Sequence, residues 1–260
     1  ASSAEIRMDG SSVPASAVAY NEASNDGGGV YTIKILDGNE EWWVAFGCGI
    51  QNTEFSATKT QIVFNTADGP GGIFGRRSVD ELGLAGYTLC LTESLVQGNT
   101  MTGGGITDPL VPRDIKPAGL YYQHEHWNLG ATIDLQSCTF AQHSSAAITF
   151  LGGQIVPTIV GCNVTDNGVG LFTTASAGAY VYHCTFDNNG RAPLKTHVIV
   201  RNSDIAADFG LRFEYSSFLS NGTQCGFDID KSGSEEAFGL SRCNLQGFTG
   251  SPQLYGVHLR

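Results

Sequence analysis

A short motif that recurs along the chain constrains the fold more than any other sequence feature. Each copy contains a Cys or Ser, an apolar residue two positions later, and in most copies an Asn or another polar turn residue about five positions later. In the second half of the chain, consecutive copies lie 22 to 32 residues apart. The copies begin at Cys48, Cys138, Cys162, Cys184, Ser216 and Cys243. Such a repeat predicts a stack of similar structural units.

A second series of four-residue segments interleaves with the first, at steps of 21 to 30 residues. Side chains within the copies alternate with a period of two, as Val181 and His183 alternate with Tyr182 and Cys184, and β-branched and aromatic residues dominate. The Asn after each copy is expected in a turn, because Asn tolerates the left-handed backbone region. The pattern predicts two or three short strands per unit. The members of the second series are Gly119–Tyr122, Ala147–Phe150, Gly168–Leu171, His197–Val200, Gly226–Ile229 and Gly256–Leu259.

The composition agrees with a β-rich chain and excludes several other classes. Of 260 residues 34 are Gly, about twice the usual proportion, and only 15% are charged, against a usual ~25%. A coiled coil or a helical bundle needs more Glu, Lys and Arg than this. An apolar fraction of 41% is enough to bury a sizeable core, which argues against a disordered chain.

A unit of this length with short strands is typical of a parallel β-solenoid, in which equivalent residues of successive coils stack into columns. The copies at residues 161–167 and 183–189 read GCNVTDN and HCTFDNN. They resemble the coil repeat of the right-handed parallel β-helix, or pectin-lyase-like, superfamily. The resemblance is clear over residues 119–260 and extends more loosely back to about residue 28. A two-sheet antiparallel sandwich is the alternative, but it does not require one motif at a near-constant step.

We therefore expect an all-β chain folded as a right-handed parallel β-helix of roughly eight or nine coils. Residues 1–28, rich in Ala, Ser, Asn and Gly, are expected to form an N-terminal arm or cap, and residues 29–260 the β-helix. Residues 99–117, with three consecutive Gly and three Pro, are expected to leave the solenoid as a loop. Arg260 directly follows a repeat strand, so we expect further chain or a partner subunit to cover that end.

The charge of the chain bears on its partners. With 14 basic and 25 acidic residues its formal net charge is −11, which argues against nucleic acid and against anionic membranes as partners. The one basic pair, Arg76–Arg77, is too small for a basic patch. No apolar stretch reaches the ~18 residues of a membrane span.

Cysteines and histidines are weak candidates for metal ligands. Seven cysteines include no CxxC spacing, and a column of stacked thiols is expected to fill the interior as small apolar side chains. In a strand, His124 and His126 share one face and are consistent with two ligands of one metal ion. No third ligand has a supporting spacing, and partly exposed histidines are the alternative. We expect no cofactor.

Acidic residues supply the candidates for catalysis. Asp228 and Asp230 form one candidate pair for a two-carboxylate glycosidase or a calcium site, and Asp208 and Glu214 form a second. Members of the superfamily that degrade polysaccharides carry carboxylates on one face, which is what the resemblance implies here. Solvated surface acids are the alternative on a chain of this charge, so no residue is assigned as catalytic.

Five aromatic residues are candidates for stacking on sugar rings or for contacts with a partner: Trp42, Trp43, Tyr121, Tyr122 and Trp127. The alternative is that they pack in the core.

Three functional classes follow from the resemblance. The first is a structural or adhesion protein of a phage or virus particle (tailspike, fibre or capsid-attached decoration), assembled as a homotrimer or with other viral structural proteins at the virion surface or elsewhere outside the cell. The second is an extracellular polysaccharide hydrolase or lyase, and the third is a secreted bacterial adhesin domain. The first is the main expectation, because no residue set reaches the geometry that catalysis requires. A surface polysaccharide is its candidate ligand.

Overall fold

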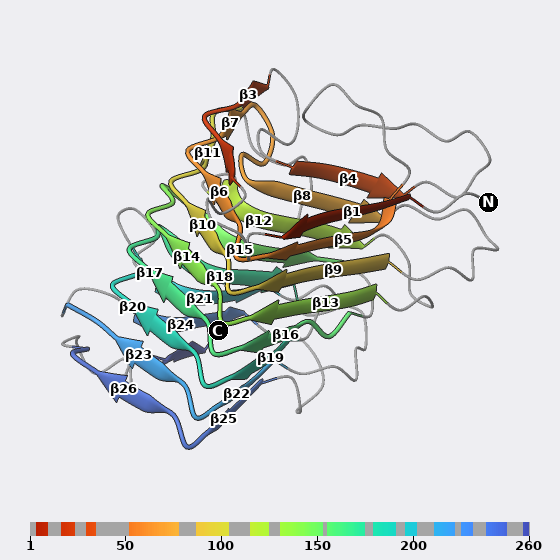
Figure 1. Ribbon diagram of the computed structural model, residues 1–260. Helices are drawn as coiled ribbons and strands as arrows, with labels where there is room; N and C mark the ends of the chain where they lie inside the picture. Colours follow the sequence, from red (N-terminus) through yellow and green to blue (C-terminus); the bar gives the residue numbers. More distant parts are fainter. Residues whose placement is uncertain are drawn as a thin grey trace.

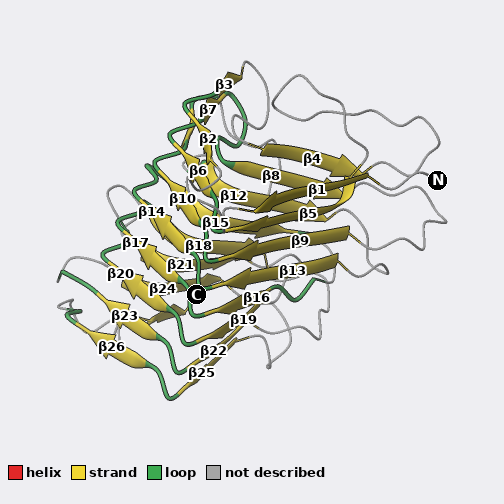
Figure 2. Cartoon of the chain, viewed as in Figure 1, coloured by secondary structure: helices red, strands yellow, loops and turns green. Residues whose placement is uncertain are grey.

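The computed structural model describes residues 4–9, 17–23, 30–34, 52–77, 87–103, 115–124, 131–152, 155–174, 179–190, 196–201, 211–221, 225–230, 238–248 and 257–259. Within these ranges all regular structure is β-strand (Figure 2). The strands form three eight-stranded sheets and one small sheet, and every pairing between them is parallel. The predicted all-β parallel β-helix is thereby confirmed, and the antiparallel sandwich is excluded.

Each long sheet takes one strand from each successive turn of the chain. Sheet A comprises β1 (Ala4–Asp9), β5 (Asn52–Thr58), β9 (Tyr87–Thr92), β13 (Ala131–Gln136), β16 (Thr158–Val160), β19 (Ala179–Tyr182), β22 (Leu211–Glu214) and β25 (Phe238–Ser241). Sheet B comprises β2 (Ala17–Ala19), β6 (Gln61–Val63), β10 (Leu95–Gln97), β14 (Thr139–Ala141), β17 (Asn163–Thr165), β20 (Thr185–Asp187), β23 (Ser217–Leu219) and β26 (Asn244–Gln246).

Sheet D comprises β4 (Val30–Lys34), β8 (Ile73–Arg77), β12 (Pro117–His124), β15 (Ala146–Leu151), β18 (Val169–Thr174), β21 (Thr196–Arg201), β24 (Cys225–Asp230) and β27 (Val257–Leu259). The small sheet C comprises β3 (Glu22–Ala23), β7 (Thr66–Ala67) and β11 (Thr100–Met101). Sheet D lies behind sheet A, and the short strands of sheet B join the two along one side (Figure 1). The chain passes from A to B to D and then begins the next turn.

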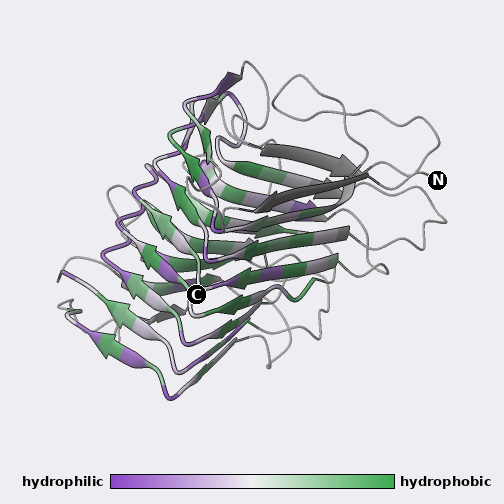
Figure 3. Cartoon of the chain, in the orientation of Figure 1, coloured by the Kyte–Doolittle hydropathy of each residue, from purple (hydrophilic) through white to green (hydrophobic). Residues whose placement is uncertain are grey.

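The core fills the space enclosed by the three long sheets. Alternating side chains point inward, and the middle residue of each sheet B strand is apolar, as the stacked green bands in Figure 3 show. In successive turns this column contains Phe140, Val164, Phe186 and Phe218, each fully buried. The stacked rings of Phe186 and Phe218 have centroids 5.0 Å apart. The repeat therefore places like residues in contact across turns.

One predicted alignment of the repeat is shifted by two residues. The sequence series aligned Val169 with Ile148 and Val198, whereas the structure pairs Leu171 with both. Val169 instead pairs with Ala146 and Thr196. Leu171 belongs to the main core, whereas Val169 belongs to a second apolar cluster that also contains Phe172 and Ile199, so the core position expected for Val169 is wrong.

The structure describes parts of the N-terminal segment and of the predicted loop. Residues 1–28, expected as an arm or cap, contain β1, β2 and β3, which pair in parallel with β5, β6 and β7. Backbone hydrogen bonds form such pairs whatever the side chains, so a segment poor in apolar residues joins the sheets. Of the loop expected at 99–117, residues 99–103 continue a turn of the solenoid through β11, and residues 104–114 lie outside the described ranges. The number of coils in the whole chain stays a prediction.

Two polar columns stabilise the corners of the solenoid. At the A-to-B corner the buried thiols of Cys138, Cys162 and Cys184 are free, as expected. They also accept hydrogen bonds between turns: the main-chain N–H of Cys138 donates to Cys162 Sγ, and that of Cys162 donates to Cys184 Sγ, each at 3.4 Å. Cys48 lies outside the described residues. The two turns before Cys138 place Ser94 and Thr60 at this position, where the Thr60 N–H donates to Ser94 Oγ at 3.1 Å.

At the B-to-D corner, buried asparagines form the second column. The main-chain N–H of Asn65 donates to Asn99 Oδ1 at 2.9 Å, and that of Asn167 donates to Asn189 Oδ1 at 3.2 Å. The expectation that these asparagines adopt the left-handed conformation is wrong. The residue before each of them does so instead, and these residues are Phe64, Gly98, Asp166 and Asn188. The asparagine is selected for its side-chain hydrogen bonds, not for its backbone freedom.

Candidate ligand-binding face

The described candidate acids lie on different sheets. Asp228 is on sheet D, where its carboxylate forms an ion pair with Arg201 at 2.7 Å, and both side chains are largely buried. Glu214 ends β22 on sheet A and accepts a hydrogen bond from the Tyr180 hydroxyl at 3.3 Å. Asp230 ends β24, and its side chain is not described; Asp208 lies outside the described residues. Each candidate pair, Asp228 with Asp230 and Asp208 with Glu214, therefore has one member whose side chain is not described, and both pairs stay predictions.

Arg201 also ties Asp228 to the backbone of the sheet. Besides the carboxylate, its guanidinium donates to the main-chain oxygens of Val200 and Asp228 at 3.2 and 3.3 Å. The Asp228 carboxylate is thus engaged by a partner of opposite charge within sheet D. The ion pair links the turns that carry β21 and β24.

The other predicted site residues are only partly described. Tyr122 belongs to the main core, and Tyr121 packs with Phe74, Phe172 and Ile199 in a second apolar cluster on the outer face of sheet D. Both tyrosines are at most 1% exposed, so the structure places neither ring on an open surface. His124 ends β12, and its side chain is not described. Trp42, Trp43, His126 and Trp127 lie outside the described residues.

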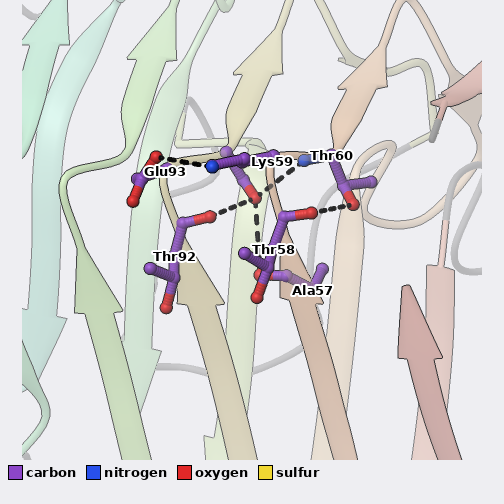
Figure 4. Close-up of polar contacts among 7 residues, drawn as sticks. Ala57, Thr58, Lys59, Thr60, Thr92 and Glu93 are labelled. Carbon is purple, nitrogen blue, oxygen red and sulfur yellow. Dashed lines mark hydrogen bonds and ion pairs between the residues drawn. The ribbon is translucent and has the colours of Figure 1, made fainter. Parts of the chain in front are cut away.

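The A-to-B corner places a column of outward-facing side chains beside sheet A. Its residues all have positive φ: Lys59, Glu93, Ser137, Gly161, His183, Tyr215 and Arg242. Each of the first six donates its main-chain N–H to the last sheet A residue of the next turn, as Lys59 does to Thr92 at 2.9 Å. Figure 4 shows the start of this column, where Lys59 Nζ lies 3.7 Å from Glu93 Oε2. The left-handed backbone is thus what turns these side chains outward.

Further along this column, aromatic side chains replace charged ones and form a cluster. On β19, Tyr180 and Tyr182 point outward while Ala179 and Val181 point into the core. The tyrosine rings lie nearly parallel, with centroids 6.0 Å apart and an interplanar angle of 13°. The corner residues His183 and Tyr215 continue the cluster: their rings stack at 5.2 Å, and both contact Tyr182 edge-on.

Charged side chains border this cluster. Arg242 lies over the Tyr215 ring, with Cζ 5.2 Å from the centroid, and its guanidinium donates to the Tyr215 hydroxyl. Glu214 is next to Tyr182 in the sheet register, and Arg212 is next to Tyr180. The pKa of Tyr180 lies above its usual value, first because of partial desolvation and then because of the negative charge of Glu214. We call Tyr180, Tyr182, His183, Arg212, Glu214, Tyr215 and Arg242 the aromatic face.

The turns on either side of the aromatic face carry small side chains. Thr158 and Val160 precede Tyr180 and Tyr182 in the register, with Gly161 at the corner position. Gly239 and Ser241 follow Arg212 and Glu214. A Cβ built at Gly239 would meet no atom beyond its chain neighbours closer than Arg212 Cγ at 4.0 Å. The outward-facing side chains of sheet A are therefore smaller in the turns on both sides of Tyr180 and Arg212.

The sequence reasoning missed this face, although a signal was present. Tyr180 and Tyr182 alternate with the inward-pointing Val181, and that spacing alone predicts two tyrosines on the outer surface of one strand. His183 and Tyr215 each precede a repeat residue, Cys184 or Ser216, so the repeat also predicts that they stack. The alternation expected beyond Tyr182 is wrong: the left-handed corner at His183 turns its side chain outward, as that of Tyr182 is, and Cys184 packs in the core with Val181.

A second exposed aromatic pair lies at the B-to-D corner. Tyr20 and Phe64 stack with centroids 5.4 Å apart and are 77% and 41% exposed. The Phe64 ring lies over Gly98, whose missing side chain leaves the space that the ring occupies. This pair has no charged side chain among its described contacts and is separate from the aromatic face.

The part of the chain that the structure describes contains neither a metal-binding cluster nor a membrane-spanning helix. Those residues contain no group of three or more His, Cys, Asp or Glu side chains placed to hold a metal ion. They also contain no helix long and apolar enough to cross a membrane.

Comparison with known proteins gives one match. The family described as a right-handed β-helix region matches residues 113–251, more than half of the chain. No curated protein and no solved structure matches the sequence. The matched range contains the turns from β12 to β26, where the parallel register and the corner columns are continuous. On the match and on its architecture, the chain belongs to the right-handed β-helix family.

Proposed function

We propose that the chain is a structural and adhesion component of a phage or virus particle, a rigid β-helical rod that binds a partner through its outer surface and performs no catalysis. The observation that carries this proposal is the contrast between Asp228 and the aromatic face. Asp228 is held by Arg201 on sheet D, whereas the exposed side chains of sheet A gather aromatic rings. Aromatic side chains bordered by a few polar groups are typical of binding surfaces.

The hydrogen bonds between successive turns support a structural role for the solenoid. The polar columns join each turn to the next through buried hydrogen bonds, such as Asn167 Nδ2 to Asn189 Oδ1 at 2.8 Å. Turns that contact only their neighbours form an extended, quasi-one-dimensional structure. The resemblance of the repeat to tailspike and fibre proteins supports a location at a virion surface or at another extracellular site.

In this proposal the rod assembles as a homotrimer or with other structural proteins of the particle. Multi-angle light scattering of the purified chain tests this part. The expected mass is three times that of one chain, and a stable monomer at micromolar concentration contradicts the assembly.

A polysaccharide hydrolase or lyase is the alternative, and one observation favours it. The Glu214 carboxylate lies within the aromatic face, next to the Tyr180 hydroxyl. Incubation with capsular polysaccharides, followed by a reducing-end assay, separates the two functions. The structural proposal expects no release of oligosaccharides. Release that Glu214→Gln abolishes, and that Asp228→Asn leaves unchanged in a folded protein, contradicts it.

A further inference from the structure

Three Asn-Gly dipeptides occupy the same position of the repeat, five residues after its first Cys or Ser: Asn167-Gly168, Asn189-Gly190 and Asn221-Gly222. This dipeptide is prone to deamidation, because Gly presents its main-chain nitrogen to the Asn side chain without the hindrance of a side chain of its own. We propose that Asn167 and Asn189 are deamidation sites that the folded solenoid keeps unreactive, and that a chain left unfolded is converted there and loses its ability to refold. This inference goes beyond the proposed function and does not depend on it.

The reaction needs only the chain and water. The main-chain nitrogen of the Gly bonds to Cγ of the preceding Asn, the Cγ–Nδ2 bond breaks, and ammonia leaves with the proton that the nitrogen gives up. Water then adds to one of the two carbonyls of the resulting succinimide ring, and the bond from that carbonyl to the ring nitrogen breaks, so that the nitrogen regains a proton. The product is aspartate or isoaspartate, depending on which carbonyl is attacked.

The B-to-D corner explains why Gly follows Asn at both buried sites. A Cβ built at Gly168 would lie 2.6 Å from the Ser144 oxygen, so the close approach of two turns excludes a side chain there. Gly190 has a φ of 93°, a conformation that residues with a Cβ rarely adopt. The asparagine column and the tight corner together therefore require the reactive dipeptide.

In the folded chain the attacking nitrogens are directed elsewhere. The Gly168 N–H donates to the His143 oxygen at 3.0 Å, and the Gly190 N–H donates to the Asn167 oxygen at 2.9 Å. Each N–H is thereby aimed at the preceding turn of the solenoid, and its hydrogen is held in a main-chain hydrogen bond. Attack on Cγ of the preceding Asn requires that bond to break first.

The side-chain amides are also fixed, and water is excluded. Asn167 Nδ2 donates to the Phe140 oxygen at 3.0 Å and to Asn189 Oδ1 at 2.8 Å. Asn189 Nδ2 donates to the Val164 oxygen at 2.7 Å. Both asparagines are fully buried, so no solvent reaches the amide that would leave or the ring that would be hydrolysed. Protection therefore lasts only as long as the two turns stay packed.

The chain provides its own comparison sites. Asn221 has the same dipeptide but is exposed, and its side chain donates to Asn188 Oδ1 on the outer surface at 2.9 Å. Asn65 and Asn99 belong to the buried column, but each is followed by Thr. A β-branched side chain crowds the neighbouring main-chain nitrogen, so these two should react slowly even in an unfolded chain.

Conversion of a column residue damages the fold. In an aspartate at position 167, an oxygen replaces Nδ2 and faces the Phe140 oxygen and Asn189 Oδ1, which are both acceptors. A buried carboxylate without donors at these positions is strongly unfavourable. Isoaspartate adds one atom to the main chain ahead of β18 and so disturbs its register with β15 and β21. A deamidated chain therefore cannot rebuild the column.

Peptide mass mapping of the full chain tests the inference, after incubation in concentrated urea and in buffer at the same mildly alkaline pH. In urea we expect Asn167, Asn189 and Asn221 to convert at similar rates, and Asn65 and Asn99 much more slowly. In buffer Asn167 and Asn189 should convert at least about a hundredfold more slowly than in urea, because the reaction must pass through a small unfolded population. Asn221 should convert in both samples.

Refolding of the same samples tests the consequence. Ion exchange separates chains by the added negative charge, and circular dichroism follows urea unfolding of each fraction after dilution. Chains converted at Asn167 or Asn189 should not regain the original unfolding midpoint, whereas chains converted only at Asn221 should. The variants Asn167→Asp and Asn189→Asp should lower the midpoint or fail to fold, and the matched control Asn221→Asp should leave it unchanged.

Four results would overturn the inference. In buffer they are conversion of Asn167 or Asn189 as fast as in urea, or no difference between these sites and Asn221. In urea it is conversion no faster than that of Asn65 and Asn99. The fourth is an unchanged unfolding midpoint for chains with aspartate at position 167 or 189.

Discussion

The main-chain N–H of His143 donates to Asn167 Oδ1 at 3.0 Å, so a histidine occupies one position of the asparagine column. The turn before it has Asn99 in the column, and the turns after it have Asn167 and Asn189. His143 is fully buried, and its Nδ1 lies 2.7 Å from the Ala141 oxygen. A carbonyl only accepts, so Nδ1 carries the hydrogen and Nε2 is left as an acceptor, without a partner among the described residues.

Acid should destabilise the fold through two buried histidines. Burial lowers the pKa of His143 from 6.5 to about 3 and that of His197 to about 4. Between pH 6.5 and these values the unfolded chain binds protons that the folded chain does not. Stability is therefore complete above pH 6.5 and falls as the pH drops, by about 1.4 kcal/mol per pH unit for each histidine. Urea unfolding at several pH values between 7 and 4 measures this slope, and a flat profile would contradict it.

His143→Asn should remove one of the two buried imidazoles that resist protonation in the folded state. It should also complete the asparagine column. The new amide would accept from the Asn99 N–H and donate to the Val96 oxygen, as Asn99 Nδ2 itself donates to the Ile62 oxygen. We expect the free energy of unfolding at neutral pH to change by less than about 1 kcal/mol, because the new hydrogen bonds offset the lost packing of the imidazole ring. Below pH 6 the variant should be the more stable protein. His183→Asn makes the same change at an exposed corner position, leaves both buried columns intact and is the matched control.

Asn167→Ala should destabilise the solenoid by about 2–5 kcal/mol. The Asn167 side chain accepts from His143 and donates to the Phe140 oxygen and to Asn189 Oδ1. Its loss leaves buried polar groups in two turns without these partners. Asn163→Ala, at an exposed position of the preceding strand, should cost well under 1 kcal/mol. Equal midpoints of urea unfolding for the two variants would refute a structural role for the column.

Gly119→Ala should be strongly destabilising, with a loss of about 1–3 kcal/mol or more. A Cβ at Gly119 would collide with the Ala147 oxygen and with the His143 ring, and neither the backbone nor the packed ring has room to move. Gly239→Ala adds the same methyl group where the nearest atom beyond the chain neighbours is 4.0 Å away. It should be neutral or slightly stabilising, because Gly weakens a strand. The thermal unfolding midpoints of the two variants compare the same Gly-to-Ala change at a crowded position and at an uncrowded one.

Phe218→Ala should cost about 3–5 kcal/mol by opening a cavity in the sheet B column. Its ring is fully buried, stacks on Phe186 at 5.0 Å and meets Phe227 at 4.5 Å. Phe64→Ala removes an equal side chain that is 41% exposed and should cost clearly less. Equal losses in the free energy of unfolding for the two variants would contradict the stabilising role of the inward-facing sheet B column.

The repeat motif was enough to predict the fold and the interior. Cys162 and Cys184 lie where the motif placed them, as stacked free thiols, and the apolar residue two positions later points into the core. Two earlier copies, at Thr60 and Ser94, kept the same spacing to Asn65 and Asn99 but escaped notice because their first residue differs. Thr, Ser and Cys are equivalent there because each side chain donates a hydrogen bond to the main-chain oxygen two residues earlier.

The sequence by itself determined the period, the strand faces and the residue types of the buried columns, since these follow from alternation and from recurrence at a fixed step. Only the tertiary structure decided which side chains meet on the outer surface. Tyr182 and Tyr215 are far apart along the chain, and their contact depends on the pairing of β19 with β22 and on a left-handed corner residue. In the same way it separated Glu214 from Asp228, because the two acids lie on strands of different sheets. Outward-facing residues need not match their neighbours in size or polarity, so the repeat does not predict them. Their contacts follow from the strand register and from the corner geometry.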